Sequence, residues 1–158
     1  MHALRTYRVD EWLGPADLPG LPRTYSALAY QTPDRMRLEV DNGFQRVWVG
    51  DTRYARDRPD GAWQVEGVGP RAVAPRFDWD PAGAAAVAPR EIGAEQIDGV
   101  ATRLVAFFEP LGTSPAWFRL WVDGDGLVRR ARMDTGGAHF MEDRFRGFDA
   151  PLALEPPI

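Results

Sequence analysis

The stretches AWFRLWVDGDGLVRRARM, residues 116–133, and HFMEDRFRGFD, residues 139–149, predict three antiparallel strands. Side chains alternate between the two faces of a strand, so Trp117 and Trp121 share one face and Phe118 lies on the other. Both faces of the expected sheet therefore carry bulky side chains. This pattern favours a curved sheet that wraps an apolar interior and is also packed or rimmed on its outer side.

The composition indicates one folded domain. The chain has 158 residues, of which 44% are hydrophobic and 11% aromatic, which is enough to bury a single core. It has no cysteine, which excludes disulfides and zinc sites built on thiolates. No apolar run is long enough to span a bilayer, and the first residues lack the apolar core of a signal peptide. We therefore predict a single domain over residues 1–158.

Charges of both signs are interspersed along the chain. Nineteen basic residues, all of them arginine, and 23 acidic residues give a formal net charge of −4. A dedicated nucleic-acid surface would need a basic patch, which this distribution does not provide. The sequence therefore predicts no nucleic-acid partner.

Turn signals recur at short intervals, which is typical of a mainly β domain. Asn42-Gly43 is the strongest hairpin dipeptide in the chain. The strands expected in the first part are 4–13, 24–32, 35–40, 44–49, 52–56 and 62–66. Those expected in the second part are 95–97, 101–109, 117–122, 127–133 and 138–148.

One short helix is expected between the two groups of strands. Asp80 is a good N-cap residue, Pro81 fits the first helical position, and Pro89 would end the helix after residues 82–88. A helix of about two turns is unstable in isolation, so it would have to dock against the sheet. The predicted fold class is therefore mainly β (α+β).

Several short motifs resemble known families. The segments 121–130 (WVD…GLVRR) and 145–157 (FRGFDAPLALEPP) are similar to the strand-turn-strand signature and the final strand of the LolA/LppX-like fold. That family comprises bacterial lipoprotein carriers and mycobacterial lipid-binding lipoproteins. More narrowly, 105–108 (VAFF), 116–122 (AWFRLWV) and 137–141 (GAHFM) resemble extracytoplasmic domains fused to CopD-type copper-resistance membrane proteins.

The resemblance implies an antiparallel half-barrel of about ten strands, with a short helix plugging its concave face and an apolar cavity between them. It implies a non-enzymatic domain on the extracytoplasmic side, periplasmic or cell-surface, that binds a lipid or lipoprotein acyl chain or a protein partner. Family members normally carry a helix before the first strand, and this chain starts almost directly in that strand. We therefore expect a domain excised from a longer membrane or secreted protein, whose membrane-embedded part is a partner.

Two alternatives to a carrier role remain open. The first is a copper-handling accessory domain of a copper-resistance membrane protein. The second is a structural or interaction module that binds no ligand.

Aromatic side chains at strand positions are candidates for lining an apolar cavity. An indole ring offers a large apolar body and one polar group, which suits a cavity with a wet mouth. The same side chains could equally form a filled core. The predicted ligand-binding residues are Trp48, Trp63, Phe108, Trp117 and Trp121.

His139 and Met141 are two residues apart, which places both side chains on one face of a strand. An imidazole and a thioether together suit Cu(I) better than they suit hard cations. Met133 on the neighbouring strand could supply a third ligand if the turn between them puts it in register. The alternative is that both methionines fill the core. No cofactor other than Cu(I) is indicated.

Other polar motifs have simpler structural explanations. Asp123 and Asp125 lack the further oxygen ligands and the distal glutamate of a calcium loop, so a hairpin turn is expected there. Neither Ser26 nor Ser114 lies in a Gly-x-Ser-x-Gly elbow, so nucleophilic catalysis is not predicted. Arginines between residues 129 and 146 alternate with aromatics and acids, and we expect a solvated outer face with cross-strand ion pairs.

Overall fold

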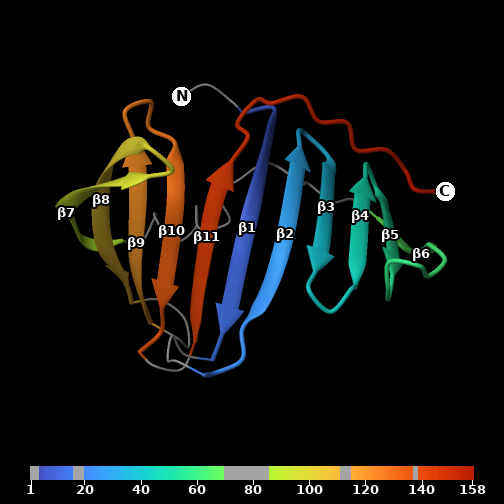
Figure 1. The fold of residues 1–158 in the computed structure, drawn as a ribbon, viewed down its shortest axis with the longest axis horizontal. Helices are drawn as coiled ribbons and strands as arrows, with labels where there is room; N and C mark the ends of the chain where they lie inside the picture. Colours follow the sequence, from blue (N-terminus) through green and yellow to red (C-terminus); the bar gives the residue numbers. More distant parts are fainter. Residues whose placement is uncertain (1–3, 16–19, 70–85, 111–114, 137–138) are drawn as a thin grey trace. The chain divides into compact units, whose positions relative to one another are not determined.

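The computed structural model describes residues 4–15, 20–69, 86–110, 115–136 and 139–158, which form an antiparallel sheet (Figure 1). Its strands are β1 (Thr6–Gly14), β2 (Thr24–Gln31), β3 (Arg35–Val40), β4 (Gln45–Val49), β5 (Thr52–Arg56), β6 (Gln64–Val68), β7 (Val87–Ile97), β8 (Val100–Glu109), β9 (Ala116–Asp123), β10 (Val128–Asp134) and β11 (Phe140–Arg146). Neighbouring strands follow the order β6-β5-β4-β3-β2-β1-β11-β10-β9-β8-β7.

The chain divides into two compact units. Unit 1 consists mainly of Glu11–Arg23 and Phe77–Phe145, and unit 2 consists of His2–Asp10, Thr24–Arg76 and Arg146–Ile158. The prediction of a single domain over residues 1–158 stays a prediction.

Unit 2 places its core on one face of β2, β3 and β4. Tyr30 pairs with Met36, which pairs with Trp48, so strand alternation puts these three side chains on the same face. Each is at most 8% exposed. The Tyr7 ring stacks on the Tyr30 ring, with the centroids 4.5 Å apart. We call these four residues the core face of unit 2.

The opposite face of unit 2 is covered in part by the segment that follows β11. Leu154 is only 4% exposed. Its amide donates a hydrogen bond to Gln31 Oε1 over 2.8 Å, and its carbonyl accepts one from Arg35 Nη1. Side chains of β2 and β3, rather than strand pairing, therefore hold this segment on the sheet.

One face of unit 1 is mainly apolar, and the other carries ion pairs. Phe107 pairs with Phe118, which pairs with Met133, which pairs with Met141, so all four share one face. Strand alternation extends this apolar face of unit 1 by Val105, Leu120, Ala131 and Phe145. It also places two buried acids there, Asp143 opposite Ala131 and Glu109 opposite Ala116. The other side, here called the ion-paired face of unit 1, carries Trp117, Arg119, Trp121, Arg130, Arg132, Asp134, Phe140, Glu142 and Arg144.

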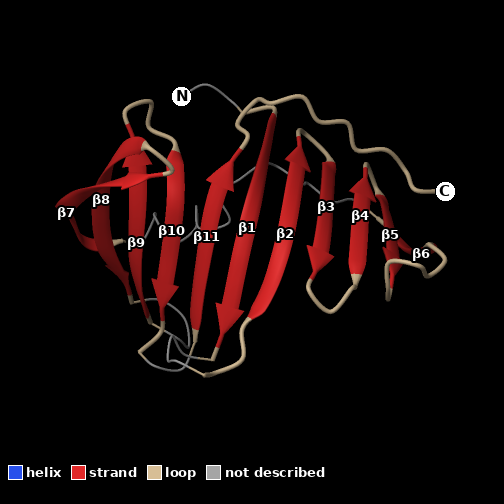
Figure 2. Ribbon diagram, in the orientation of Figure 1, coloured by secondary structure: helices blue, strands red, loops and turns tan. Residues whose placement is uncertain are grey.

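The predicted helix is not confirmed. Residues 80–85 lie outside the described residues, while Val87 and Ala88 already belong to β7. The described residues contain no helix (Figure 2) and hence none that could cross a membrane. Pro89, expected to end a helix, lies within β7. The ladder shifts register between Val87 and Arg90, and this bulge accommodates a residue without an N–H.

The expected strands are mostly confirmed, with different ends. The strand expected at 95–97 is the end of a much longer strand, because β7 begins at Val87. The strand expected at 62–66 is shifted to Gln64–Val68, and the one expected at 138–148 spans Phe140–Arg146. The described residues form eleven strands, as many as the sequence pattern predicts, whereas the family resemblance implies about ten.

Candidate functional site

The ion-paired face of unit 1 confirms the predicted cross-strand pairing of arginines and acids. Glu142 accepts from Arg130 Nη2 over 2.7 Å and lies 3.6 Å from Arg132 Nη1. Asp134 pairs with Arg132 and with Arg119 Nη2, the latter over 2.6 Å. The hydrogen bond from Arg132 and the one from Arg119 lower the pKa of Asp134, against the effect of burial. Each arginine named here has a carboxylate within its reach, so this face is not a basic patch.

Three of the predicted ligand-binding residues lie on the same ion-paired face. Trp117 is 54% exposed, and its ring lies 4.9 Å from that of Phe108. Trp121 is buried instead: its Nε1 donates to Glu95 Oε2 over 2.9 Å, and the guanidinium of Arg130 lies 4.4 Å from its ring centroid. The structure thus brings Phe108 and Trp117 together and gives Trp121 a fixed structural setting.

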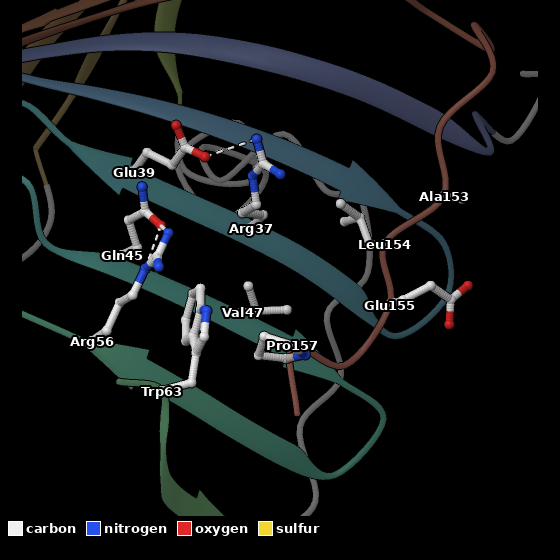
Figure 3. A pocket seen from close by; sticks show the side chains of 10 residues that line it. All are labelled: Arg37, Glu39, Gln45, Val47, Arg56, Trp63, Ala153, Leu154, Glu155 and Pro157. Carbon is white, nitrogen blue, oxygen red and sulfur yellow. Dashed lines mark hydrogen bonds and ion pairs between the residues drawn. The ribbon is translucent and has the colours of Figure 1, made fainter. Parts of the chain in front are cut away.

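The other two predicted ligand-binding residues are not brought together in unit 2. Trp48 is 3% exposed and belongs to the core face. Val47 points to the opposite face, where it lines a cavity of about 210 Å³ together with Trp63 (Figure 3). Contact of all five aromatic residues with a ligand stays a prediction.

This cavity lies between β3–β5 and the segment that follows β11. Arg56 donates through Nε and Nη2 to the same oxygen, Gln45 Oε1, over 2.8 and 2.5 Å. Its guanidinium lies 4.6 Å from the centroid of the Trp63 ring. Arg37 forms an ion pair with Glu39 over 2.7 Å at the same cavity. The wall is therefore a layer of guanidinium, amide and indole groups that contact one another.

A second cavity of about 420 Å³ lies in unit 2 near the start of β1. Arg5 and Asp149 both line this cavity, and Asp149 Oδ1 accepts a hydrogen bond from the Arg5 amide over 2.7 Å. Thr6 Oγ1 donates to the Ala150 carbonyl over 2.7 Å. These bonds anchor the segment after β11 to β1.

Two of the predicted metal ligands, Met133 and Met141, share one strand face. Met133 lies directly opposite Met141 in the β10–β11 ladder, so the register condition for the third ligand is met. His139 is exposed and lies two residues before Met141. The Thr135 amide donates to the His139 carbonyl over 2.9 Å, which places the histidine at the end of the same ladder. Among the described residues, no group of three or more His, Cys, Asp or Glu could hold a metal ion.

The expected turn at Asp123 is confirmed, and it is built around that side chain. Asp123 is 3% exposed and accepts hydrogen bonds from the amides of Asp125 and Leu127 and from Arg129 Nε. Burial opposes its ionisation, yet these three donors together keep its pKa below the ordinary value. Asp123 is therefore a structural carboxylate.

A second polar cluster in unit 2 was not predicted. Arg146 Nε donates to Asp10 Oδ2 over 2.6 Å, and the Tyr25 hydroxyl donates to Asp10 Oδ1 over 2.7 Å. These bonds raise the pKa values of Tyr25 and Arg146. Sequence spacing gives no signal for the cluster, because Asp10 and Arg146 lie at opposite ends of the chain.

Solved structures with this strand arrangement include two mycobacterial proteins. The lipoprotein LppX of Mycobacterium tuberculosis superposes with a TM-score of 0.62 at 16% identity, over 96% of this chain and 90% of LppX. LprF from Mycobacterium bovis gives a TM-score of 0.65 at 15% identity, over 98% of this chain and 90% of LprF. MucB gives 0.51 at 16% identity, over 97% of this chain and 56% of MucB.

The chain matches no protein-family model and no curated protein. The structural likenesses span nearly the whole chain. The chain therefore has the LolA/LppX-like fold.

Proposed function

We propose that this chain is a non-enzymatic, extracytoplasmic domain that binds a lipid or lipoprotein acyl chain on the apolar face of unit 1. The fold shared with the lipoprotein LppX supports this location and role. The proposal includes the prediction that this chain is a domain of a longer membrane or secreted protein. Its partner would then be the membrane-embedded part of that same protein.

The separation of side chains in unit 1 carries the proposal. Phe107 and Phe118 are buried on the apolar face, while Leu120, Met133 and Met141 beside them are half-buried. Methionine side chains adapt to irregular apolar shapes, as an acyl chain requires. Arg119, Arg130 and their acids pair with one another on the opposite face, where they are not buried against an acyl chain. The acids on the apolar face itself, Asp143 and Glu109, are buried within the protein. A partly accessible, adaptable apolar surface is therefore ready for an apolar occupant.

Substitution of Leu120 by asparagine should weaken binding of a fluorescent fatty acid about tenfold. A polar amide on the apolar face replaces favourable burial of about 1.5–3 kcal/mol with a desolvation cost. The measurement is a saturation titration of the full chain, supported by native mass spectrometry for co-purified acyl chains. Leu120 is half-buried, so the variant should remain folded.

Trp117→Gln, a polar substitution on the ion-paired face of the same strand, distinguishes this proposal from the prediction that Trp117 contacts the ligand. With the acyl chain on the apolar face, this variant leaves fatty-acid binding unchanged. If Trp117→Gln abolishes binding and Leu120→Asn does not, the ligand lies on the exposed Phe108–Trp117 pair and the assignment to the apolar face is wrong.

A second candidate function, copper handling, is favoured by the register of β10 and β11. Met133 and Met141 are cross-strand partners, whose Cβ atoms lie about 5 Å apart in such ladders. His139 is exposed and directly precedes β11, and continuing the strand alternation would place its imidazole on the same face. Two thioethers and one imidazole form a soft donor set that suits Cu(I), and all three ligands are neutral when they bind. In this second candidate function, the chain is a copper-handling accessory domain of a copper-resistance membrane protein.

Competition with a Cu(I) chelator should reveal one tight site in the wild-type chain. His139→Ala and Met141→Leu should each weaken it at least about tenfold, because Cu(I) has few ligands to lose. Met133→Leu tests the third ligand. Equal competition by wild type and His139→Ala would eliminate the copper candidate and leave the methionines as part of the apolar face.

A further inference from the structure

We propose that the cavity of unit 2 lined by Arg56 and Trp63 is a binding site for an oxyanion, a carboxylate or phosphate group. The proposal concerns the face opposite the core face of unit 2. It does not rest on acyl-chain binding by unit 1, so either proposal can fail without the other.

Arg56 differs from the neighbouring arginines in the partner that accepts its hydrogen bonds. Strands β3–β5 carry five arginines, and four of them form ion pairs within 4.0 Å. These pairs are Arg35–Glu155, Arg37–Glu39, Arg46–Glu66 and Arg53–Glu66. In the part of the chain that the structure describes, Arg56 has no carboxylate partner; Gln45, which is neutral, accepts its hydrogen bonds. Arg56 therefore brings a positive charge without a counter-charge to the cavity wall.

The guanidinium of Arg56 is also held in place before any ligand arrives. Two of its nitrogens donate to Gln45 Oε1, and one of its faces lies over Trp63. A guanidinium presents five donors in a planar fork, so donors remain after the bonds to Gln45 are made. A fixed planar fork matches the geometry of carboxylate and phosphate oxygens, and little side-chain entropy is lost on binding.

The rest of the cavity can accept such a group. Its volume of about 210 Å³ exceeds the roughly 30 Å³ that one water molecule occupies in the liquid, so several heavy atoms fit. The two acids at its wall already have cations of their own: Glu39 pairs with Arg37, and Glu155 with Arg35. Figure 3 shows Glu155 at the end of the cavity away from Arg56. Apolar contacts come from Val47, Leu154 and Pro157, so the oxyanion can belong to an amphiphile.

The test is a titration of the ¹⁵N-labelled full chain, with the Trp63 indole N–H resonance, assigned through Trp63→Phe, as the reporter. Sodium phosphate, sodium acetate and dihexanoyl phosphatidic acid are added at constant ionic strength, so that screening alone moves nothing. At least one of the three should shift the resonance saturably. Tighter binding of the phosphatidic acid than of phosphate would identify an anionic amphiphile as the source, and equal binding a free anion.

Arg56→Gln should weaken the saturable binding at least about tenfold, because a charge-assisted hydrogen bond is lost. Arg58→Gln is the matched control: it removes the same charge two residues away, from a side chain that is 76% exposed and paired with Asp60. It should leave the affinity unchanged. Arg56→Lys keeps the charge without the planar fork, so it should bind more weakly than wild type.

Two results would overturn the proposal. One is a shift that grows linearly with all three anions and does not saturate, which would mean non-specific association. The other is equal affinity in Arg56→Gln and Arg58→Gln. If Arg56→Gln fails to fold, two other variants replace it in the test. Arg56→Lys removes the planar fork, and Gln45→Ala removes the acceptor that holds Arg56. Unchanged affinity in both variants would also contradict the proposal.

Discussion

Replacing Asp123 by alanine should lower the free energy of unfolding by about 3 kcal/mol. The side chain is 2% exposed and accepts hydrogen bonds from Arg129 Nε over 2.6 Å and from the amides of Asp125 and Leu127, each over 2.9 Å. The variant leaves these three donors without their acceptor in the β9–β10 turn. Urea denaturation followed by circular dichroism measures the loss.

Asp125→Ala is the control for this prediction, because it removes an exposed carboxylate from the same turn. It should change the free energy of unfolding by no more than about 0.5 kcal/mol. Similar losses in the two variants would mean that the turn, and not the buried carboxylate, provides the stability.

The same carboxylate should make stability depend on pH. Hydrogen bonds hold the pKa of Asp123 below its ordinary value, although burial opposes this. The stabilisation is therefore complete above the ordinary aspartate pKa of about 4 and is lost as the pH falls through the lower folded-state value. Asp123→Asn cannot ionise, so its unfolding free energy should fall less steeply across this acidic range than that of wild type.

Replacing Phe140 by alanine should cost about 3–5 kcal/mol, the largest stability loss expected for a single substitution in this chain. Phe140 is 2% exposed, and its ring lies between Gly14 and the guanidinium groups of Arg23 and Arg132. The loss combines the lost burial of the ring with the cavity that remains. Thermal and urea unfolding of the two proteins measure it.

Gly14→Ala tests the same contact from the other side. A Cβ atom there would lie 2.5 Å from Phe140 Cε1, so the buried ring would have to move, at a cost of about 1–3 kcal/mol. In a Phe140→Leu background the cost should be smaller, because the two substitutions are coupled. Gly93→Ala in β7 meets nothing within 4 Å and serves as the control. An equal cost of Gly14→Ala in both backgrounds would contradict the predicted contact.

Much of the hairpin architecture could be predicted from the sequence, because it is encoded locally. The alternation in residues 35–40 and the Asn42-Gly43 turn predict β3 with its observed ends, Arg35–Val40. The strand at Thr52–Arg56 is likewise confirmed to the residue. In residues 35–40 apolar and charged side chains alternate, and this period of two is visible in the sequence.

Strand β7 could not be predicted because no burial pattern marks it. Ten of its eleven residues are exposed, so nothing selects for alternating apolar side chains. The sequence instead contains an N-cap residue, Asp80, and a stop residue, Pro89, which together are typical of a short helix. Pairing with β8, a tertiary interaction, overrides that local preference.

The cavity at Trp63 was beyond local prediction for a different reason. It joins β3–β5 to residues 153–157, which are about a hundred positions away in the sequence. The sequence predicts that Trp63 lines an apolar cavity. In the structure the guanidinium of Arg56 lies over the Trp63 ring, so this part of the cavity wall is charged. The sequence predicts that arginines and acids pair across strands. Which acid pairs with which arginine depends on the order of the strands in the sheet, as the pairing of Arg146 with Asp10 shows.

The irregular ladder of β7 also bears on solubility. An edge strand with regular, unpaired amides is a template on which further chains can stack into fibrils. In β7 the backbone lacks an N–H at Pro89, the register shifts again between Glu91 and Gly93, and charged side chains flank these breaks. An incoming strand cannot form a continuous ladder there. The features that make β7 difficult to recognise in the sequence are the same ones that keep this edge from becoming an aggregation seed.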